Sequence, residues 1–142
     1  IAAGVGDARL AATREIGVPL GVAFQLRDDL LGVYGDPALT GKPAGDDLRE
    51  GKRTVLVAIA RESLPAAARS LVDELLGDSD LTDEQIGLLR RAFIDSGAVD
   101  HVERAIAFNV ERAMDALRRA DLATSAAREL GALADAVATR DA

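Results

Sequence analysis

An all-α fold is predicted by three features of this 142-residue sequence. Hydrophobic residues make up 49% of the chain but aromatic residues only 3%, so that alanine and leucine dominate the apolar positions. Apolar residues recur three and four positions apart in most segments, which is the spacing of a buried helix face. The only strand-like alternation, residues 54–59, fits a helix equally well. We therefore expect residues 1–142 to form one helical domain without a second domain.

The first expected helix is the longest and runs from Asp7 to about Tyr34. Asp7 is a suitable N-cap, and a Gly-Asp-Pro turn follows Tyr34. Pro19 lacks a backbone N–H, so we expect an interruption or kink near it. The segment after the kink, residues 20–33, is apolar on most faces and is expected at the centre of the bundle.

Residues 35–52 contain four glycines and two prolines and are expected to form an irregular loop. A loop of this length is usually functional or disordered, and its paired charges favour a function. Asp36, which precedes Pro37, is expected to cap the turn.

Further helices are expected over 53–62, 66–76, 82–96, 98–120 and 125–140. Val55, Leu56 and Ile59 should face inward on the first of these. Thr82 and Gln85 form a capping box. His101 and the charged groups of these helices, Arg90 and Arg91 among them, are expected on solvated faces.

Composition excludes several classes of function. The net charge of −7, from 17 basic and 24 acidic residues, argues against a nucleic-acid partner. No apolar run is long enough for a membrane span. The absence of cysteine excludes disulfides and thiolate metal sites and agrees with a cytoplasmic location.

The polar residues of the apolar segment 20–33 need an explanation. Gln25, Asp28 and Asp29 have helical spacing, so that Gln25 lies beside both carboxylates. Two adjacent carboxylates on a largely buried helix repel each other unless a cation lies between them or one is protonated. Arg27 should point away from them and form an ion pair, either on the far side of the helix or at a helix interface.

The loop after this helix supplies the complementary charges. It carries two lysines, each after a glycine that lets a ligand approach the backbone, and two adjacent aspartates: Lys42, Lys52, Asp46 and Asp47. Carboxylates and lysines around one concavity are what a magnesium-bound polyphosphate needs, since Mg²⁺ takes oxygen ligands and ammonium groups meet phosphate oxygens.

The segment FQLRDDLLGVYGDPALTGKPAGDDLREGKRT, residues 24–54, resembles the second aspartate-rich region of the trans-polyprenyl (isoprenyl) diphosphate synthases. The resemblance rests on an ordered series: the FQ pair, the DD pair, a GDP turn, GK, G-x-D-L and GK-x-T. Gly32 stands where the family pattern has a third aspartate.

The resemblance implies the C-terminal portion of a helical bundle of the isoprenoid synthase type. The family's first aspartate-rich motif has no counterpart here, so we expect the C-terminal half of a longer protein, inactive by itself. The implied reaction joins an allylic diphosphate to isopentenyl diphosphate, depends on Mg²⁺ and releases pyrophosphate from what is expected to be a homodimer.

The resemblance also implies roles for individual residues, with 35–52 as the diphosphate- and Mg²⁺-binding loop. The implied magnesium ligands, direct or through water, are Asp28, Asp29 and Asp47. The implied contacts to the substrate diphosphate are Lys42 and Lys52. Gln25 is implied to lie near the diphosphate and the reacting carbon, and Gly21 and Phe24 to line a tunnel for the growing chain. Asp46 is expected to serve the loop structure only.

Two alternatives remain open. A class I terpene cyclase has the same fold, but its N-D-x-x-S-x-x-x-E pattern is not found in this sequence. A non-catalytic helical partner or regulatory subunit is supported by Gly32 and by the missing first motif. Turnover of geranyl or farnesyl diphosphate with isopentenyl diphosphate separates the synthase from the regulatory subunit.

Overall fold

The computed structural model describes residues 6–41, 43, 45–120 and 122–139. The described residues form helices and no strand, which confirms the all-α prediction. The helices, in chain order, are α1 (Asp7–Tyr34), α2 (Pro37–Thr40), α3 (Asp46–Arg49), α4 (Val55–Ser63), α5 (Ala66–Leu75), α6 (Asp83–Asp95), α7 (Ala98–Arg119) and α8 (Thr124–Thr139). None of the helices in these described ranges combines the length and the hydropathy that crossing a bilayer requires.

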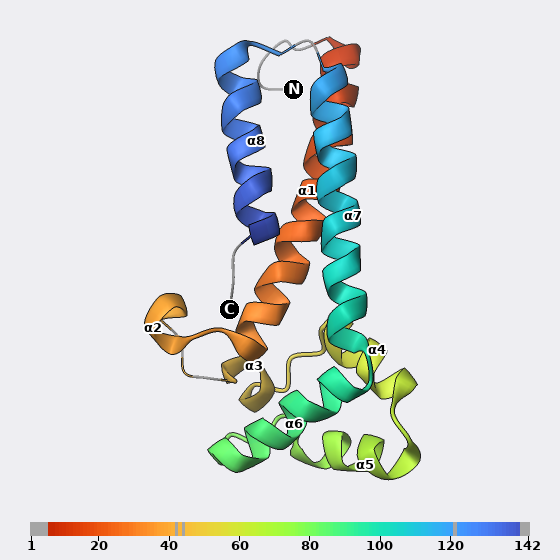
Figure 1. Cartoon of the computed structure of the whole chain (residues 1–142), viewed down its shortest axis with the longest axis vertical. Helices are drawn as coiled ribbons and strands as arrows, with labels where there is room; N and C mark the ends of the chain where they lie inside the picture. Colours follow the sequence, from red (N-terminus) through yellow and green to blue (C-terminus); the bar gives the residue numbers. More distant parts are fainter. Residues whose placement is uncertain (1–5, 42, 44, 121, 140–142) are drawn as a thin grey trace. The chain divides into compact units, whose positions relative to one another are not determined.

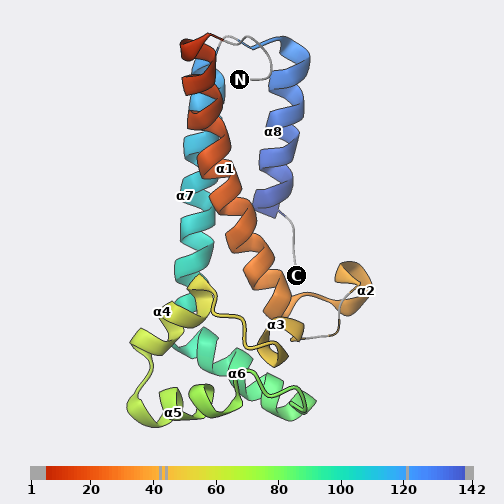
Figure 2. The same cartoon turned by 180° about the vertical axis from the view of Figure 1, so that it is seen from behind.

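The chain divides into two compact units, and α1 and α7 each contribute to both. Among the described residues, the first unit contains 6–25 and 105–139, and the second contains 26–104. In the first unit, α8 turns back and runs antiparallel to the second part of α7 (Figures 1 and 2). Ile16 of α1 and Leu117 of α7 are buried in its core, and Leu130 of α8 packs against them.

Pro19 lies inside α1, and the helix continues through it from Asp7 to Tyr34. The predicted interruption therefore does not divide the helix. Proline removes one backbone hydrogen bond, and the Pro19 ring is buried, so packing offsets part of that loss.

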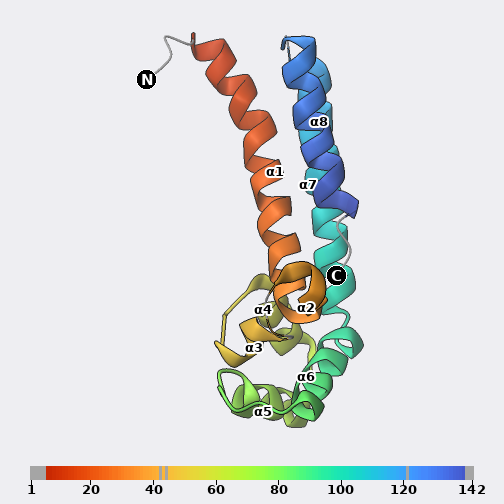
Figure 3. The ribbon, with the colours of Figure 1, turned by 90° about the vertical axis from the view of Figure 1, so that its left-hand side faces the viewer.

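The second unit combines the last turns of α1 with α2–α6 and the first turns of α7. Helix α6 packs against α4 and α5. Among the described residues, the fully buried side chains of this unit come from six helices and include Val33, Leu48, Leu56, Val72, Phe93 and Val102. Burying each of the larger ones contributes about 1.5–3 kcal/mol relative to exposure. Helix α3 lies next to the end of α1 (Figure 3).

Residues 35–52 are more ordered than the expected irregular loop, since they contain the one-turn helices α2 and α3. The Asp36 carboxylate accepts a hydrogen bond from the Ala38 N–H at 2.8 Å, which confirms the predicted capping role. Pro37 occupies the first turn of α2, and Gly41 (φ +70°) ends it. Gly45, also with φ +70°, directly precedes α3.

The predicted inward face of α4 is confirmed at Leu56 and wrong at Val55, and Ile59 is half-buried. Leu56, Val57 and Ala60 are buried, whereas Val55 is 49% exposed, so the inward assignment of Val55 is wrong. The Thr54 hydroxyl caps this helix by accepting from the Val57 N–H, which makes Val55 the first helical residue. The capping box of Thr82 and Gln85 at the start of α6 is confirmed.

Candidate functional site

Three carboxylates and one ammonium group meet where α1 and α3 approach each other in the second unit. The Lys52 Nζ atom donates to Asp47 Oδ2 at 2.9 Å. The same nitrogen lies 3.7 Å from Asp29 Oδ1 and 3.9 Å from Asp28 Oδ2. The structure thus brings together four of the predicted site residues, from two helices and the turn after α3.

This cluster has a buried side and an accessible side. The side chains of Asp29 and Asp47 are only 7% and 5% exposed, whereas those of Asp28 and Lys52 are 48% and 37% exposed. A ligand arriving from solvent would therefore meet Asp28 and Lys52 first, with Asp29 and Asp47 behind them.

Among the described residues, the carboxylates of Asp28, Asp29 and Asp47 all lie near the Lys52 ammonium. The hydrogen bond to Asp47 raises the pKa of the Lys52 ammonium above its usual 10.5. Partial burial opposes that rise, and the charges of Asp47, Asp29 and Asp28 add to it. Lys52 consequently stays protonated at neutral pH.

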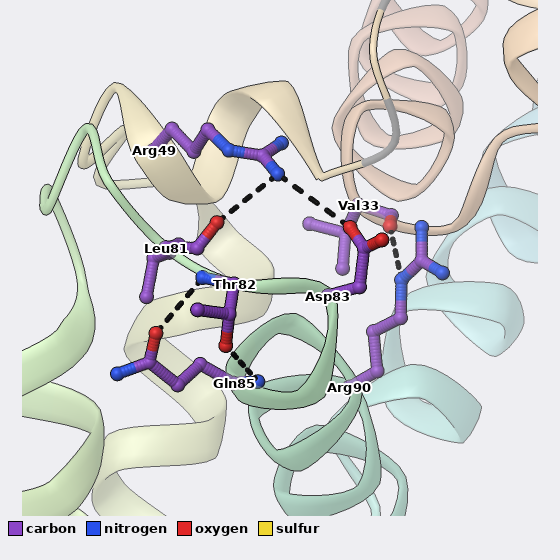
Figure 4. Close-up of polar contacts among 7 residues, drawn as sticks. All are labelled: Val33, Arg49, Leu81, Thr82, Asp83, Gln85 and Arg90. Carbon is purple, nitrogen blue, oxygen red and sulfur yellow. Dashed lines mark hydrogen bonds and ion pairs between the residues drawn. The ribbon is translucent and has the colours of Figure 1, made fainter.

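Backbone contacts fix α3 in place. Leu48 is buried, and its carbonyl accepts from the Gly77 N–H at 2.9 Å. The Lys52 N–H donates to the Asp47 carbonyl at 3.0 Å, so the two ion-paired residues are also joined through the main chain. The Arg49 guanidinium donates to the Leu81 carbonyl at 3.2 Å and lies 3.8 Å from the Asp83 carboxylate at the start of α6 (Figure 4).

The turn that carries Lys52 lies directly against the turn between α5 and α6. A Cβ on Gly51 would lie 2.9 Å from the Gly77 Cα, a distance that real side chains do not adopt. Both residues have positive φ angles, 68° and 94°, which glycine adopts without strain. Two glycines thus allow two segments of backbone to touch immediately before Lys52.

Helix α6 also holds the end of α1. The Arg90 Nε–H donates to the Val33 carbonyl at 2.7 Å (Figure 4), and the guanidinium lies over the Tyr34 ring at 5.8 Å. The expectation that Arg90 is an ordinary surface residue is therefore wrong. The last carbonyls of a helix lack intrahelical partners, and a cation there satisfies one of them and opposes the helix dipole.

Tyr34 completes this contact, since its hydroxyl donates to the Arg90 carbonyl at 2.9 Å. Burial raises the pKa of Tyr34 to about 12, and the nearby Arg90 charge lowers it slightly. The phenol is therefore a neutral hydrogen-bond donor at any physiological pH.

Arg27 forms the predicted ion pair at a helix interface. Its two terminal nitrogens donate to the two carboxylate oxygens of Glu103, on α7, at 2.7 and 2.8 Å. The Arg27 side chain is only 11% exposed. This pair and the carboxylate cluster both lie in the second unit. The pair joins α1 to α7, whereas the cluster brings α1 and α3 together.

The four side chains that define this cluster do not include the other predicted site residues that the structure describes. Gln25 is exposed on the part of α1 that belongs to the first unit, as are Gly21 and Phe24, the latter 51% exposed. Lys42 lies outside the described residues. Asp46 is the first residue of α3.

Within the described ranges, no group of three or more His, Cys, Asp and Glu side chains is arranged to hold a metal ion. The atoms of the cluster that could bind a metal are nonetheless carboxylate oxygens. Mg²⁺ prefers oxygen ligands. Mg²⁺ is usually bound by one or two carboxylates together with waters and substrate phosphates, not by a complete protein cage. The residues present fit such a partial site.

Sequence reasoning missed the supporting roles of Arg49, Arg90 and Gly77, and it expected Gly51 to admit a ligand where the structure shows contact with the Gly77 backbone. Their partners are distant along the chain, so no local pattern marks them. The positive φ of Gly51 and Gly77 could have been expected from turn chemistry, but their mutual contact could not.

The profile of the polyprenyl synthetase family matches residues 1–91 of the chain. The geranylfarnesyl diphosphate synthase of Aeropyrum pernix is 44% identical over 133 residues, which are 92% of this chain and 40% of that protein. The (2E,6E)-farnesyl diphosphate synthase of Mycobacterium bovis is 32% identical over 142 residues, covering 97% of this chain and 38% of that protein.

Solved structures show the same likeness. The geranylgeranyl pyrophosphate synthase of Corynebacterium glutamicum, complexed with isoprenyl diphosphate and magnesium, superimposes with a TM-score of 0.90 at 38% identity. The match covers 97% of this chain and 39% of that one. The polyprenyl synthase of Caulobacter crescentus, complexed with calcium and isoprenyl diphosphate, gives 0.82 at 35% identity, covering 98% of this chain and 42% of that one. The chain therefore spans about two fifths of the length of these relatives.

Proposed function

Since this chain belongs to the polyprenyl synthetase family, we propose that the full-length protein joins an allylic diphosphate to isopentenyl diphosphate. The product is a longer trans-polyprenyl diphosphate, and pyrophosphate is released. The observation that carries the proposal is the meeting of Asp28, Asp29 and Asp47 around the Lys52 ammonium. The names of the similar proteins, which are prenyl diphosphate synthases, support the same reaction class.

The roles proposed for the acidic residues combine the resemblance to the family with the exposure of Asp28. Asp28 is half-exposed, so it is the carboxylate best placed to bind Mg²⁺ directly or through water. Asp47, which the resemblance to the family assigns to the metal, is the second proposed ligand, and Asp29 is proposed to act through water. Bound magnesium would neutralise charge on the diphosphate and polarise its bond to carbon.

The lysines are proposed to bind the diphosphate. Lys52 is 37% exposed and keeps its charge, so its ammonium can donate to phosphate oxygens on the solvent side of the cluster. Negative charge develops on the leaving pyrophosphate as the carbon–oxygen bond breaks, and a fixed ammonium stabilises that charge. Lys42 is proposed to do the same from the preceding loop, and Gln25 to lie near the reacting carbon.

The proposal includes a homodimer that works in the cytoplasm and needs the remainder of the synthase for turnover. Exposed apolar side chains in the first unit, among them Val18, Phe24 and Phe108, support an additional packing partner. These residues would otherwise remain in contact with water.

The test is an assay of the full-length protein with geranyl or farnesyl diphosphate, isopentenyl diphosphate and Mg²⁺. We expect a chain-elongated diphosphate and one pyrophosphate per condensation, both abolished by EDTA and restored by Mg²⁺. Release of a hydrocarbon from the allylic diphosphate alone would instead favour the terpene cyclase. A well-folded protein that yields neither product would favour the non-catalytic subunit.

A further inference from the structure

The side of α1 at Gly32 is occupied by the carboxylate of Asp47. A Cβ at position 32 would lie 2.1 Å from Asp47 Oδ2, 2.3 Å from its Cγ and 2.8 Å from Oδ1. Such distances are far inside van der Waals contact. The Asp47 carboxylate therefore lies in the volume that any side chain at position 32 would fill.

A side chain at position 32 would have to displace Asp47, because the surrounding backbone is held. Gly32 is inside α1, whose end is fixed by the bond from Arg90 to the Val33 carbonyl. On the other side, α3 is fixed by the buried Leu48 and by its bond from Gly77. The group free to yield is the Asp47 carboxylate, whose Oδ2 holds the Lys52 ammonium at 2.9 Å.

We propose that Gly32 is a positioning residue that seats the Asp47 carboxylate beside Asp28 and Asp29, an inference that rests on the diphosphate site of the proposed function. The third carboxylate of the site is then that of Asp47 on α3. The family pattern that the sequence resembles has an aspartate at position 32 of α1 instead. Gly32 acts through Asp47 and touches neither substrate nor metal.

The chain supplies a matched control for this proposal. Gly87 lies within α6, and nothing is found within 4 Å of a Cβ built on it. Gly32→Ala and Gly87→Ala thus make the same chemical change inside a helix, and alanine is the better helix former at both positions. They differ in that only the first meets the Asp47 carboxylate.

The experiment measures Mg²⁺-dependent binding of inorganic pyrophosphate to the full-length protein by calorimetry. We expect Gly32→Ala to bind roughly 10- to 100-fold more weakly, as is typical when a residue that orients a ligand is lost. Gly87→Ala should bind as the wild type does. Unchanged binding by a folded Gly32→Ala variant would overturn the proposal.

A double-mutant cycle tests whether Gly32 acts through Asp47. Asp47→Ala should weaken pyrophosphate binding by a similar factor, and Gly32→Ala should add nothing in that background. Asp47→Ala introduces no bulk, so it also keeps the proposal testable if Gly32→Ala folds poorly. A further loss in the Asp47→Ala background would mean that Gly32 acts through another contact, and the proposal would fail.

The two proposals fail in different ways. A wild-type protein that binds magnesium pyrophosphate but forms no condensation product would remove the proposed function, while a loss of binding in Gly32→Ala would keep the positioning role. A wild type that turns over, with Gly32→Ala unaffected in both binding and turnover, would keep the function and remove the positioning role.

Discussion

Two neighbouring residues of α1 take part in ion pairs of opposite kinds. Arg27 meets Glu103 through two short hydrogen bonds between a planar guanidinium and a carboxylate. Asp28 joins a cluster in which three carboxylates share the ammonium of Lys52. In the first arrangement one carboxylate and one guanidinium share two hydrogen bonds, whereas in the second three carboxylates lie 2.9 to 3.9 Å from the same ammonium nitrogen. We propose that the first contact stabilises the fold and that the second binds a ligand.

Of the substitutions at or near the cluster, replacement of Asp28 by asparagine should lower activity the most. Asp28→Asn keeps the shape of the side chain but removes a charge that repels its two neighbours. We expect kcat/KM of the full-length protein to fall by roughly two to three orders of magnitude, with Tm unchanged or raised. Steady-state kinetics and thermal unfolding measure the two effects.

The matched control for this variant is Asp46→Asn, which removes one charge from the neighbouring helix α3. Its activity should stay near that of the wild type. Full activity of Asp28→Asn would remove Asp28 from the metal site.

Lys52→Met removes the ammonium and keeps most of the aliphatic side chain. A hydrogen bond to a charged group contributes about 1.5–3 kcal/mol, so we expect pyrophosphate binding to weaken by roughly 10- to 100-fold. Calorimetric titration with Mg²⁺ present checks this, and Lys52→Arg, which retains the charge, should recover part of the affinity. Equal affinities of Lys52→Met and the wild type would contradict a contact between Lys52 and the diphosphate.

Disrupting the Arg27–Glu103 pair should lower stability and leave activity unchanged. Arg27→Met or Glu103→Gln is expected to lower the free energy of unfolding by about 1–2 kcal/mol, less than a fully buried pair because the Glu103 side chain is 44% exposed. Denaturant unfolding measures this, and the folded variants should keep their kcat/KM. A large loss of activity with unchanged stability would contradict the division between the two ion-pair arrangements.

The smallest expected effect concerns Tyr34 at alkaline pH. The pKa of Tyr34 is raised to about 12 in the folded protein from a usual 10.0, so the unfolded chain loses this proton first. The stabilisation from Tyr34 is therefore complete below about pH 10 and is lost as pH rises toward 12. Tyr34→Phe should unfold with a weaker pH dependence in this window, and a dependence equal to that of the wild type would contradict the assignment.

The sequence predicted the features that depend on near neighbours. The ends of α1, the capping box of Thr82 and Gln85 and the cap at Asp36 all follow from residues within four positions of each other. The convergence of Asp28, Asp47 and Lys52 was predicted because an ordered motif implied it. The roles of these residues, and that of Lys42, stay predictions.

The features that the sequence did not predict depend on distant contacts. Arg90 resembles any exposed arginine of an amphipathic helix until the end of α1 is placed beside it. Helices α2 and α3 are one turn each, too short for periodicity to detect. The prediction for α4 wrongly placed Val55 inward. Packing against α6, and not the local apolar pattern, selects Leu56, Val57 and Ala60 as the buried residues.

The backbone contact between Gly51 and Gly77 limits how this site can be moved or rebuilt. The segment that ends in Lys52 contacts the turn at Gly77, some 25 positions further along the chain, so a change in one turn requires a compatible change in the other. A chimera that exchanges residues 45–54 alone would bring an ill-fitting partner to the turn between α5 and α6. Protein engineers who wish to graft this acidic cluster into another bundle must therefore transfer both turns as a single cassette.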